Sequence, residues 1–174
     1  MQGPQSISPS ILNTMHRFSY VPIVLLSLAA SACAAPSMHP ARQANEYLDA
    51  HNSFRAQHGA DPLVWSAELE AKAQNWANGC TFEHGSTGEN LAVGTGEFGP
   101  AAAVKLWTDE VDQYDPNNPQ PSHFTQVVWK STTELGCAVT RCPAGTIYPE
   151  ESSYHVCEYA PPGNVIGQFP ENVQ

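Results

Sequence analysis

The chain has 174 residues, of which 41% are hydrophobic, and this is enough to build one domain around a single core. Its 17 acidic residues outnumber seven basic ones, which gives a formal charge of −10 at neutral pH. A chain this acidic is a poor partner for nucleic acid or for an anionic membrane surface, so we expect it to bind neither.

Residues 1–34 have the pattern of a secretory signal peptide. An apolar run that begins at Phe18 is followed by small residues and by an A-x-A cleavage site that ends at Ala34. The run is too short to span a bilayer comfortably, which disfavours the alternative of an N-terminal anchor. A start at Met15 would place Arg17 in a compact basic segment before the run, so Met15 is a candidate for the true initiator. We expect a secreted, extracellular protein without a transmembrane anchor after processing.

The processed chain is expected to contain a lead, one domain and a tail. Residues 35–43 are weakly patterned and predict a flexible lead, the domain is expected to cover 44–170, and 171–174 remain as a tail. Removing residues 1–34 takes away one basic residue and no acidic one, so the formal charge becomes −11. No stretch of the sequence suggests an internal repeat or a linker that would split the domain.

The first half of the domain predicts two helices. Apolar and aromatic residues recur at helical spacing over 44–58, and Gly59 is a suitable C-terminal cap. His51 lies on the apolar face, where a hydrogen-bonded core residue is the favoured interpretation. A second helix is expected after Ser66, which can cap its N-terminus, and it should end at Gly79. The glycine-rich stretch 88–99 predicts a loop with at most a short extended piece.

The second half predicts helices first and strands last. Pro100 suits the first position of a helix over 100–114, and the proline-rich segment 115–122 predicts a loop. A short helix is expected over 123–129, followed by strands at 134–142 and 153–160. Because the helices precede a small antiparallel pair and do not alternate with strands, the predicted class is α+β.

Four cysteines remain in the processed chain, an even number that predicts two disulfides in a secreted protein. Cys137 and Cys157 are nearly equidistant from a turn near Tyr148, so they can face each other across the two late strands. Three connectivities are possible in principle, and this geometry leaves Cys80 with Cys142 as the natural second bridge.

Two histidines and two glutamates are candidate site residues. His84 and Glu89 share a glycine-bounded loop, where side chains can be directed into a cleft. Glu110 lies one helical turn after Trp107 and should share its buried face, where a carboxylate needs a partner. His123 begins the apolar run HFTQVVW. Each residue alone also fits a structural role, such as a loop, cap or core position, and spacing does not show that the four converge.

Between His51 and Gly167 the chain contains the pieces HNSFRAQHG, PLVWSAELEAKAQNWA, GENLA, HFTQVVW, LGCA and YHVCEYAPPGN. With these pieces it resembles the CAP superfamily, which comprises cysteine-rich secretory proteins, antigen 5 and pathogenesis-related protein 1, and it looks most like the fungal secreted members. The resemblance implies an α-β-α sandwich with a three-stranded antiparallel sheet and a central cleft. It implies the same disulfide pairing, and a cleft tetrad of His84, Glu89, Glu110 and His123.

Such a tetrad is a reasonable ligand set for Zn²⁺ or another divalent cation, with neutral imidazole nitrogens as ligands and water in the open positions. No organic cofactor is expected. Because imidazole must lose its proton to bind, metal affinity should fall as the pH drops through about 6.5 or below. The same residues could instead form a closed hydrogen-bond network.

The resemblance implies that the protein binds a small lipid, either a sterol or a fatty acid, and we expect a monomer. In sterol-binding fungal relatives the connection before HFTQ is rich in aromatics, whereas here its candidate lipid-binding residues are Tyr114, Pro116, Pro119 and Pro121. Because this loop has one aromatic side chain, we expect sterol binding to be weaker than in those relatives. Binding of a fatty acid in an apolar groove between helices is then the remaining form of lipid binding. The alternative is a metal-dependent hydrolase, or a secreted effector that acts on a host or cell-wall partner. Enzymatic activity is less favoured than lipid binding, since neither H-E-x-x-H nor G-x-S-x-G occurs in the sequence.

Overall fold

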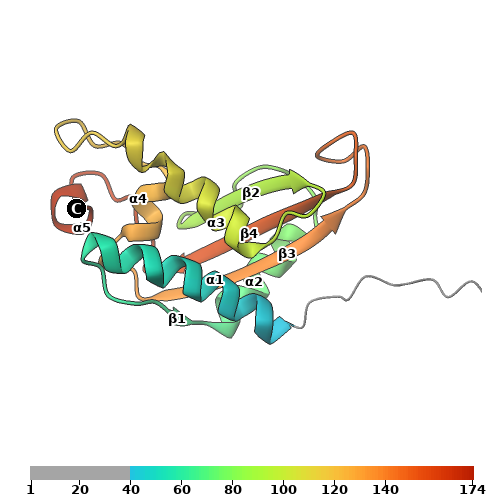
Figure 1. Ribbon diagram of the computed structural model, residues 1–174, viewed down its shortest axis with the longest axis horizontal. Helices are drawn as coiled ribbons and strands as arrows, with labels where there is room; N and C mark the ends of the chain where they lie inside the picture. The colour runs from blue at the N-terminus through green and yellow to red at the C-terminus, as the bar shows by residue number, and fades with distance from the viewer. Residues whose placement is uncertain (1–39) are drawn as a thin grey trace, which may run out of the picture. The chain divides into compact units, whose positions relative to one another are not determined.

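A computed structural model describes residues 40–174, so the predicted signal peptide and its cleavage site lie outside the described residues. Figure 1 shows the elements in chain order. They are α1 (Pro40–Arg55), η1 (Ala56–His58), β1 (Val64–Trp65), α2 (Ala67–Ala77), β2 (Glu89–Thr95), α3 (Pro100–Thr108), η2 (Asp109–Gln113), α4 (His123–Val128), β3 (Glu134–Cys142), β4 (Ser152–Ala160) and α5 (Phe169–Asn172).

The strands form one sheet in the order β1-β3-β4-β2. Strands β2, β4 and β3 are antiparallel neighbours, and these are the three strands that the resemblance implies. The two-residue strand β1 adds a fourth, parallel to β3, which the sequence analysis did not anticipate. The expectation of a loop over 88–99 was also wrong for β2, a seven-residue strand. Its whole length pairs with β4, from Glu89 opposite Glu158 to Thr95 opposite Ser152, and this long-range pairing outweighs the local glycine signal.

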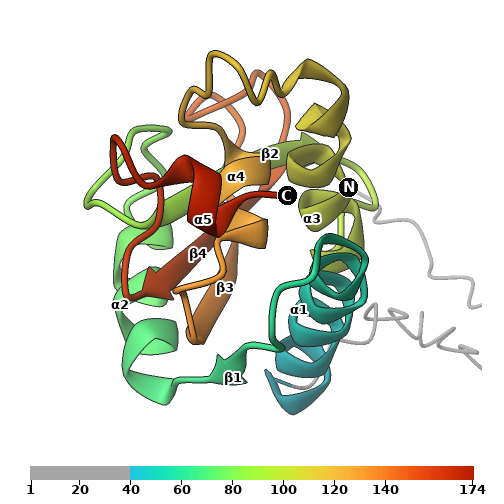
Figure 2. The ribbon, with the colours of Figure 1, turned by 90° about the vertical axis from the view of Figure 1, so that its left-hand side faces the viewer.

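Helices cover both faces of the sheet, so the predicted α+β sandwich is confirmed. Figure 2 shows α2 on one side, and α1 and α3 on the other. Helix α2 lies very close to β3 at Gly136, where an added Cβ would lie 2.1 Å from the backbone nitrogen of Glu70. The fold therefore requires a residue without a side chain at this position.

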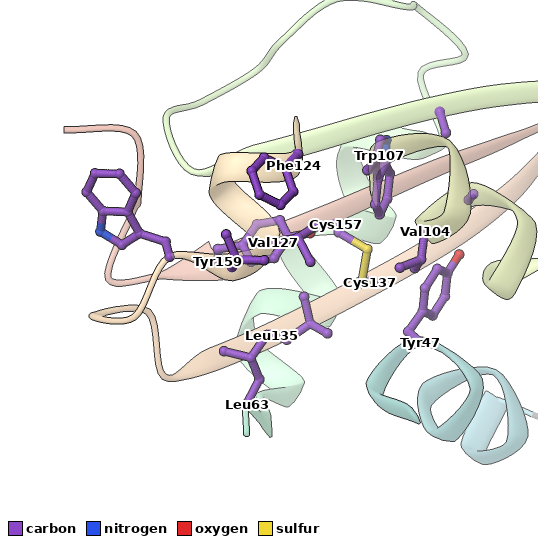
Figure 3. Packing of buried hydrophobic residues seen from close by; sticks show 14 of the residues in the cluster. Tyr47, Leu63, Val104, Trp107, Phe124, Val127, Leu135, Cys137, Cys157 and Tyr159 are labelled. Carbon is purple, nitrogen blue, oxygen red and sulfur yellow. A yellow bond between two sulfur atoms is a disulfide. The ribbon is translucent and has the colours of Figure 1, made fainter. Parts of the chain in front are cut away.

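Alternate residues of β4 contribute to two hydrophobic clusters. Cys157 and Tyr159 belong to the larger cluster, which Figure 3 shows with Trp107 and Phe124 on the α1 and α3 side of the sheet. Val156, which directly precedes Cys157, belongs to the smaller cluster under α2, as does Tyr154. This alternation is the period of two expected for a strand that is buried on both faces.

Two Tyr–His pairs connect α1 to β4. The Tyr47 hydroxyl hydrogen-bonds Nδ1 of His155, and four residues along each element Nε2 of His51 lies 2.7 Å from the Tyr159 hydroxyl. Residues i and i+4 share a face both in a helix and in a strand, so the two pairs lie in register. All four side chains are buried, and the expectation that His51 is a hydrogen-bonded core residue agrees with the structure.

The remaining ring nitrogens of these histidines face backbone carbonyls. Nδ1 of His51 lies 2.8 Å from the Tyr47 carbonyl oxygen, and Nε2 of His155 lies 2.9 Å from that of Phe98. A carbonyl can only accept, so each histidine donates there and accepts the tyrosine proton at its other nitrogen. Burial lowers the pKa of both histidines to about 4, in keeping with this neutral form.

Both disulfides form between the residues that the sequence analysis pairs. Cys137 and Cys157 lie directly opposite each other on β3 and β4, and Cys80 is bonded to Cys142 at the end of β3. The C-terminal segment is packed against the domain, since Val173 is buried in the larger cluster. Helix α1 begins at Pro40, so the last residues of the predicted flexible lead are helical. Within residues 40–174, no helix combines the length and the apolar character needed to cross a membrane.

Candidate functional site

A cleft of about 770 Å³ lies at the end of the sheet where β2 begins, and all four predicted His and Glu residues line it. His84 is in the loop before β2, Glu89 is the first residue of that strand, Glu110 is in η2, and His123 is the first residue of α4. The structure thus brings together residues from four separate segments around one cavity. They form two hydrogen-bonded His–Glu pairs.

The first pair joins an exposed histidine to a buried glutamate. Nδ1 of His84 lies 3.0 Å from Oε2 of Glu89, and the same oxygen accepts the backbone N–H of Gly85 at 2.9 Å. The His84 side chain is 57% exposed and that of Glu89 only 1%. Burial raises the pKa of Glu89 above its ordinary value; the hydrogen bond from Gly85 opposes this rise, while the negative charge of Glu158 adds to it.

The second pair is built on the start of α4. Nδ1 of His123 lies 2.6 Å from Oε1 of Glu110, and Oε2 of Glu110 accepts the backbone N–H groups of His123 and Phe124. These are free N–H groups of the first helical turn, so Glu110 caps the helix and also orients the histidine. Ser122 and Thr125 complete a reciprocal capping box at the same end.

Asn90 connects the cleft to the core. Its Nδ2 donates to the backbone carbonyl of His123 at 3.1 Å and to the Tyr159 hydroxyl at 3.2 Å. The Tyr159 hydroxyl is the group that His51 contacts from the core side. A continuous hydrogen-bonded chain therefore runs from the buried histidine to the segment that carries His123.

The two pairs have the donor set of a partly built metal site. When Nδ1 of a histidine donates its proton to a carboxylate, Nε2 keeps a lone pair that can bind a metal. His84 and His123 both have this arrangement, and both line the cleft. Within residues 40–174, however, no three His, Cys, Asp or Glu side chains are grouped closely enough to hold an ion. The histidines would be the metal ligands, water would fill the remaining positions, and Glu89 and Glu110 would orient the rings.

The predicted lipid-binding loop only partly borders the cleft. Tyr114 and Pro121 line it, whereas Pro116 and Pro119 are not among the lining residues. The Tyr114 ring packs against Phe124, with 5.6 Å between ring centroids, so this aromatic side chain is already engaged with the core. The other lining side chains from this loop are polar, namely Asp115, Asn118, Gln120 and Ser122.

A shallow groove of about 210 Å³ runs between α1 and α3. Ala50 and Phe54 of α1 and Ala101 and Val104 of α3 supply its apolar lining. Lys105 also lines the groove, where its ammonium group is paired with Asp109. The sequence predicts a groove between helices but does not indicate which residues line it.

The geometry of the fold and of the cleft, and the comparisons with known proteins, agree on the class of protein. The model of the Cysteine-rich secretory protein family, abbreviated CAP, matches residues 48–159, and the chain belongs to this family.

The chain is 40% identical to pathogenesis-related protein 1B of Nicotiana tabacum over 92% of this chain and 97% of the relative. It is 41% identical to fruiting body protein SC7 of Schizophyllum commune over 81% of this chain and 75% of the relative. Among solved structures, hookworm platelet inhibitor superposes with a TM-score of 0.61 at 25% identity over 78% of each chain. A structure of NaASP2 with Zn²⁺ gives the same TM-score at 24% identity over 78% of this chain and 87% of that one, and this likeness supports the fold alone.

Sequence reasoning missed two residues that contact the site. Asn90 directly follows Glu89 but points to the opposite face of β2, and Glu158 lies opposite Glu89 on β4. Glu158, the one carboxylate of β4, was the available signal, because a buried carboxylate on a central strand needs a partner. That partner is Lys72, whose Nζ lies 2.8 Å from Glu158 Oε2.

Proposed function

We propose that this protein is a secreted binding protein for small lipids, with a His/Glu cleft that can hold a divalent metal ion. Secretion is supported by the predicted signal peptide, by membership of a family described as secretory, and by two disulfides, which are typical of extracellular proteins. The observation that carries the lipid proposal is the groove between α1 and α3, where four of the eight lining residues are apolar.

The groove suits an acyl chain better than a rigid sterol. Its volume is only about 210 Å³, and its apolar side chains come from two helices that run side by side (Figure 2). Each buried methylene contributes about 0.8 kcal/mol, so four of them would supply roughly 3 kcal/mol of binding free energy. Lys105 lines the groove, and its exposed ammonium group, which is paired with Asp109, has a further N–H that can reach the carboxylate of a fatty acid. The loop around Tyr114, by contrast, offers a sterol one aromatic ring that is already packed on Phe124.

The lipid proposal is tested with a matched pair of variants on α3. Ala101 and Ala102 are both exposed, but only Ala101 lines the groove. Palmitate binding to the purified protein should be saturable, and Ala101→Trp should weaken it at least tenfold while Ala102→Trp leaves it unchanged. Equal binding by the two variants would remove the groove as the site. Mass spectrometry of lipids that co-purify with the secreted protein identifies the natural ligand class.

The metal proposal is tested separately. Zinc titration calorimetry should show one site in the wild type and none in the His84→Ala/His123→Ala double variant. His84 is exposed and His123 is about one-third exposed, so these truncations should leave the fold intact, which circular dichroism checks. Unchanged zinc binding in the double variant would contradict the site. Hydrolysis of a peptide or ester that is lost in His123→Ala would instead favour the alternative, a metal-dependent hydrolase.

A further inference from the structure

A second cavity, of about 470 Å³, lies between α2 and the loop that precedes β2. One wall is the outer face of α2, with Glu68, Ala71 and Trp76, and the other includes Ser86 in the loop. Glu89 borders both this cavity and the main cleft. The second cavity is thus a separate space that shares a wall with the cleft.

The lining of this cavity carries an excess of negative charge. Three of its side chains are carboxylates, those of Glu68, Glu89 and Glu158, against the one ammonium group of Lys72. Lys72 is already paired with Glu158 at 2.8 Å, and both contact the Ser86 hydroxyl. Glu68 therefore has no counter-charge in this lining, and the partner of Glu89, His84, lines the main cleft and not this cavity.

Glu89 also has an oxygen without a hydrogen-bond partner. Its Oε2 is held by His84 and Gly85, but its Oε1 is buried and has no partner among residues 40–174. The side chain, 1% exposed, starts on the sheet face covered by α2, because it is paired across the strands with Glu158. A buried carboxylate oxygen is costly unless a donor reaches it. The missing group on this side of the sheet is therefore an N–H or O–H donor.

Trp76 supplies a fixed aromatic wall. Its indole lies so close to Gly85 that an added Cβ there would be 2.6 Å from a ring carbon. The indole N–H donates to the backbone carbonyl of Glu83 at 2.8 Å, which sets the orientation of the ring. The side chain still has 36% of its surface exposed. An exposed, oriented indole beside carboxylates is a favourable contact for a cation.

We propose that this second cavity binds a small organic cation that carries N–H donors, either a primary ammonium or a guanidinium group. The N–H groups of such a ligand hydrogen-bond Oε1 of Glu89, its charge is balanced by Glu68 and Glu89, and its apolar part lies along Trp76. The donor requirement follows from the unpaired oxygen, so a quaternary ammonium ion is not expected to bind as well. The source of the group is either a free amine or an arginine or lysine side chain of a peptide.

The proposal is tested by calorimetry at low salt with n-butylguanidinium and its neutral isostere n-butylurea. The cation should bind at least tenfold more tightly than the urea. Ala71, exposed on α2 and lining the cavity, is changed to leucine to fill it, and Ala67, exposed on the same helix but outside the cavity, provides the control. Ala71→Leu should weaken butylguanidinium binding at least tenfold, Glu68→Gln should weaken it about threefold, and Ala67→Leu should have no effect.

A second readout distinguishes this cavity from the main cleft. The indole N–H resonance of Trp76 should shift on titration with butylguanidinium in the wild type and in Ala67→Leu, but not in Ala71→Leu. A parallel titration with N-acetylarginine amide separates the sources, because tighter binding of this probe indicates a peptide and tighter binding of the simple cation indicates a free amine. Equal affinity for the urea and the guanidinium, no saturable binding, or full binding by Ala71→Leu would each overturn the proposal.

Discussion

Acidification should destabilise this protein through the two buried histidines that join α1 to β4. His51 and His155 have pKa values of about 4 in the folded state, lowered from 6.5 by burial. Each accepts a tyrosine proton at one ring nitrogen and donates to a carbonyl with the other. A second ring proton would leave an N–H facing an O–H, and it would place a charge in the core.

The direction and size of the effect follow from proton linkage. Between the folded-state pKa of about 4 and the ordinary value of 6.5, each histidine binds more protons in the unfolded chain than in the folded one. Its contribution to the free energy of unfolding is therefore fully present above about pH 6.5 and is lost as the pH falls towards 4. For one such histidine, the free energy of unfolding at about pH 4.5 should be roughly 2.5 kcal/mol lower than at about pH 7. The two histidines together account for about 5 kcal/mol, a large share of the stability of a small domain.

The assay is denaturant unfolding of the wild type and of His155→Gln at both pH values. Glutamine keeps a donor and an acceptor but does not titrate, so the variant should lose about 2.5 kcal/mol less than the wild type on acidification. Carboxylates titrate in both proteins, and their contributions cancel in this difference. The reasoning is refuted if the two proteins have the same pH dependence, or if NMR titration shows the ring of His155 becoming protonated near pH 6.5.

Three further predictions concern single contacts. Glu110→Ala should lower the free energy of unfolding by about 1 to 2 kcal/mol in metal-free protein, measured by thermal denaturation, because it removes the cap of α4. Gly136→Ala should cost more than about 3 kcal/mol or prevent folding, since its Cβ would overlap α2, whereas Gly99→Ser, which has open space around it, should change urea unfolding by less than about 0.5 kcal/mol. Replacing Cys80 and Cys142 together by serine should cost roughly 4 kcal/mol, and peptide mapping of the wild type should recover these two cysteines in one linked pair.

Local signals in the sequence predicted the helices well. Ser66, Pro100 and Ser122 mark the starts of α2, α3 and α4 within one residue, although the side chain of Ser122 makes a capping hydrogen bond and that of Ser66 does not. The helix expected over 100–114 ends earlier, and its last part is the 3₁₀ segment η2. Glu110, within η2, lies at the start of α4, and no local pattern in the sequence contains this long-range contact.

The candidate site was predictable from the family resemblance and not from the residues alone. His84 and Glu89 are close in sequence, but the position of Glu89 depends on the pairing of β2 with β4. The glycines around β2 had led to the prediction of a loop there. Asn90 and Glu158 were missed for the same reason, since their roles arise from strand register. Long-range pairing of this kind is set by packing across the whole sheet, and short windows of sequence do not report it.

Strand β4 explains why the core and both cavities depend on one register. It lies between β3 and β2, and its successive residues point to opposite faces of the sheet. Tyr159 points towards α1, where it contacts His51 and, through Asn90, the segment that carries His123. Glu158 points towards α2, where it lies opposite Glu89 and binds Lys72. A shift of β2 by one residue along β4 would turn the Glu89 side chain away from His84 and from both cavities. The same pairing that buries the hydrophobic clusters therefore also positions the polar groups of the two candidate sites.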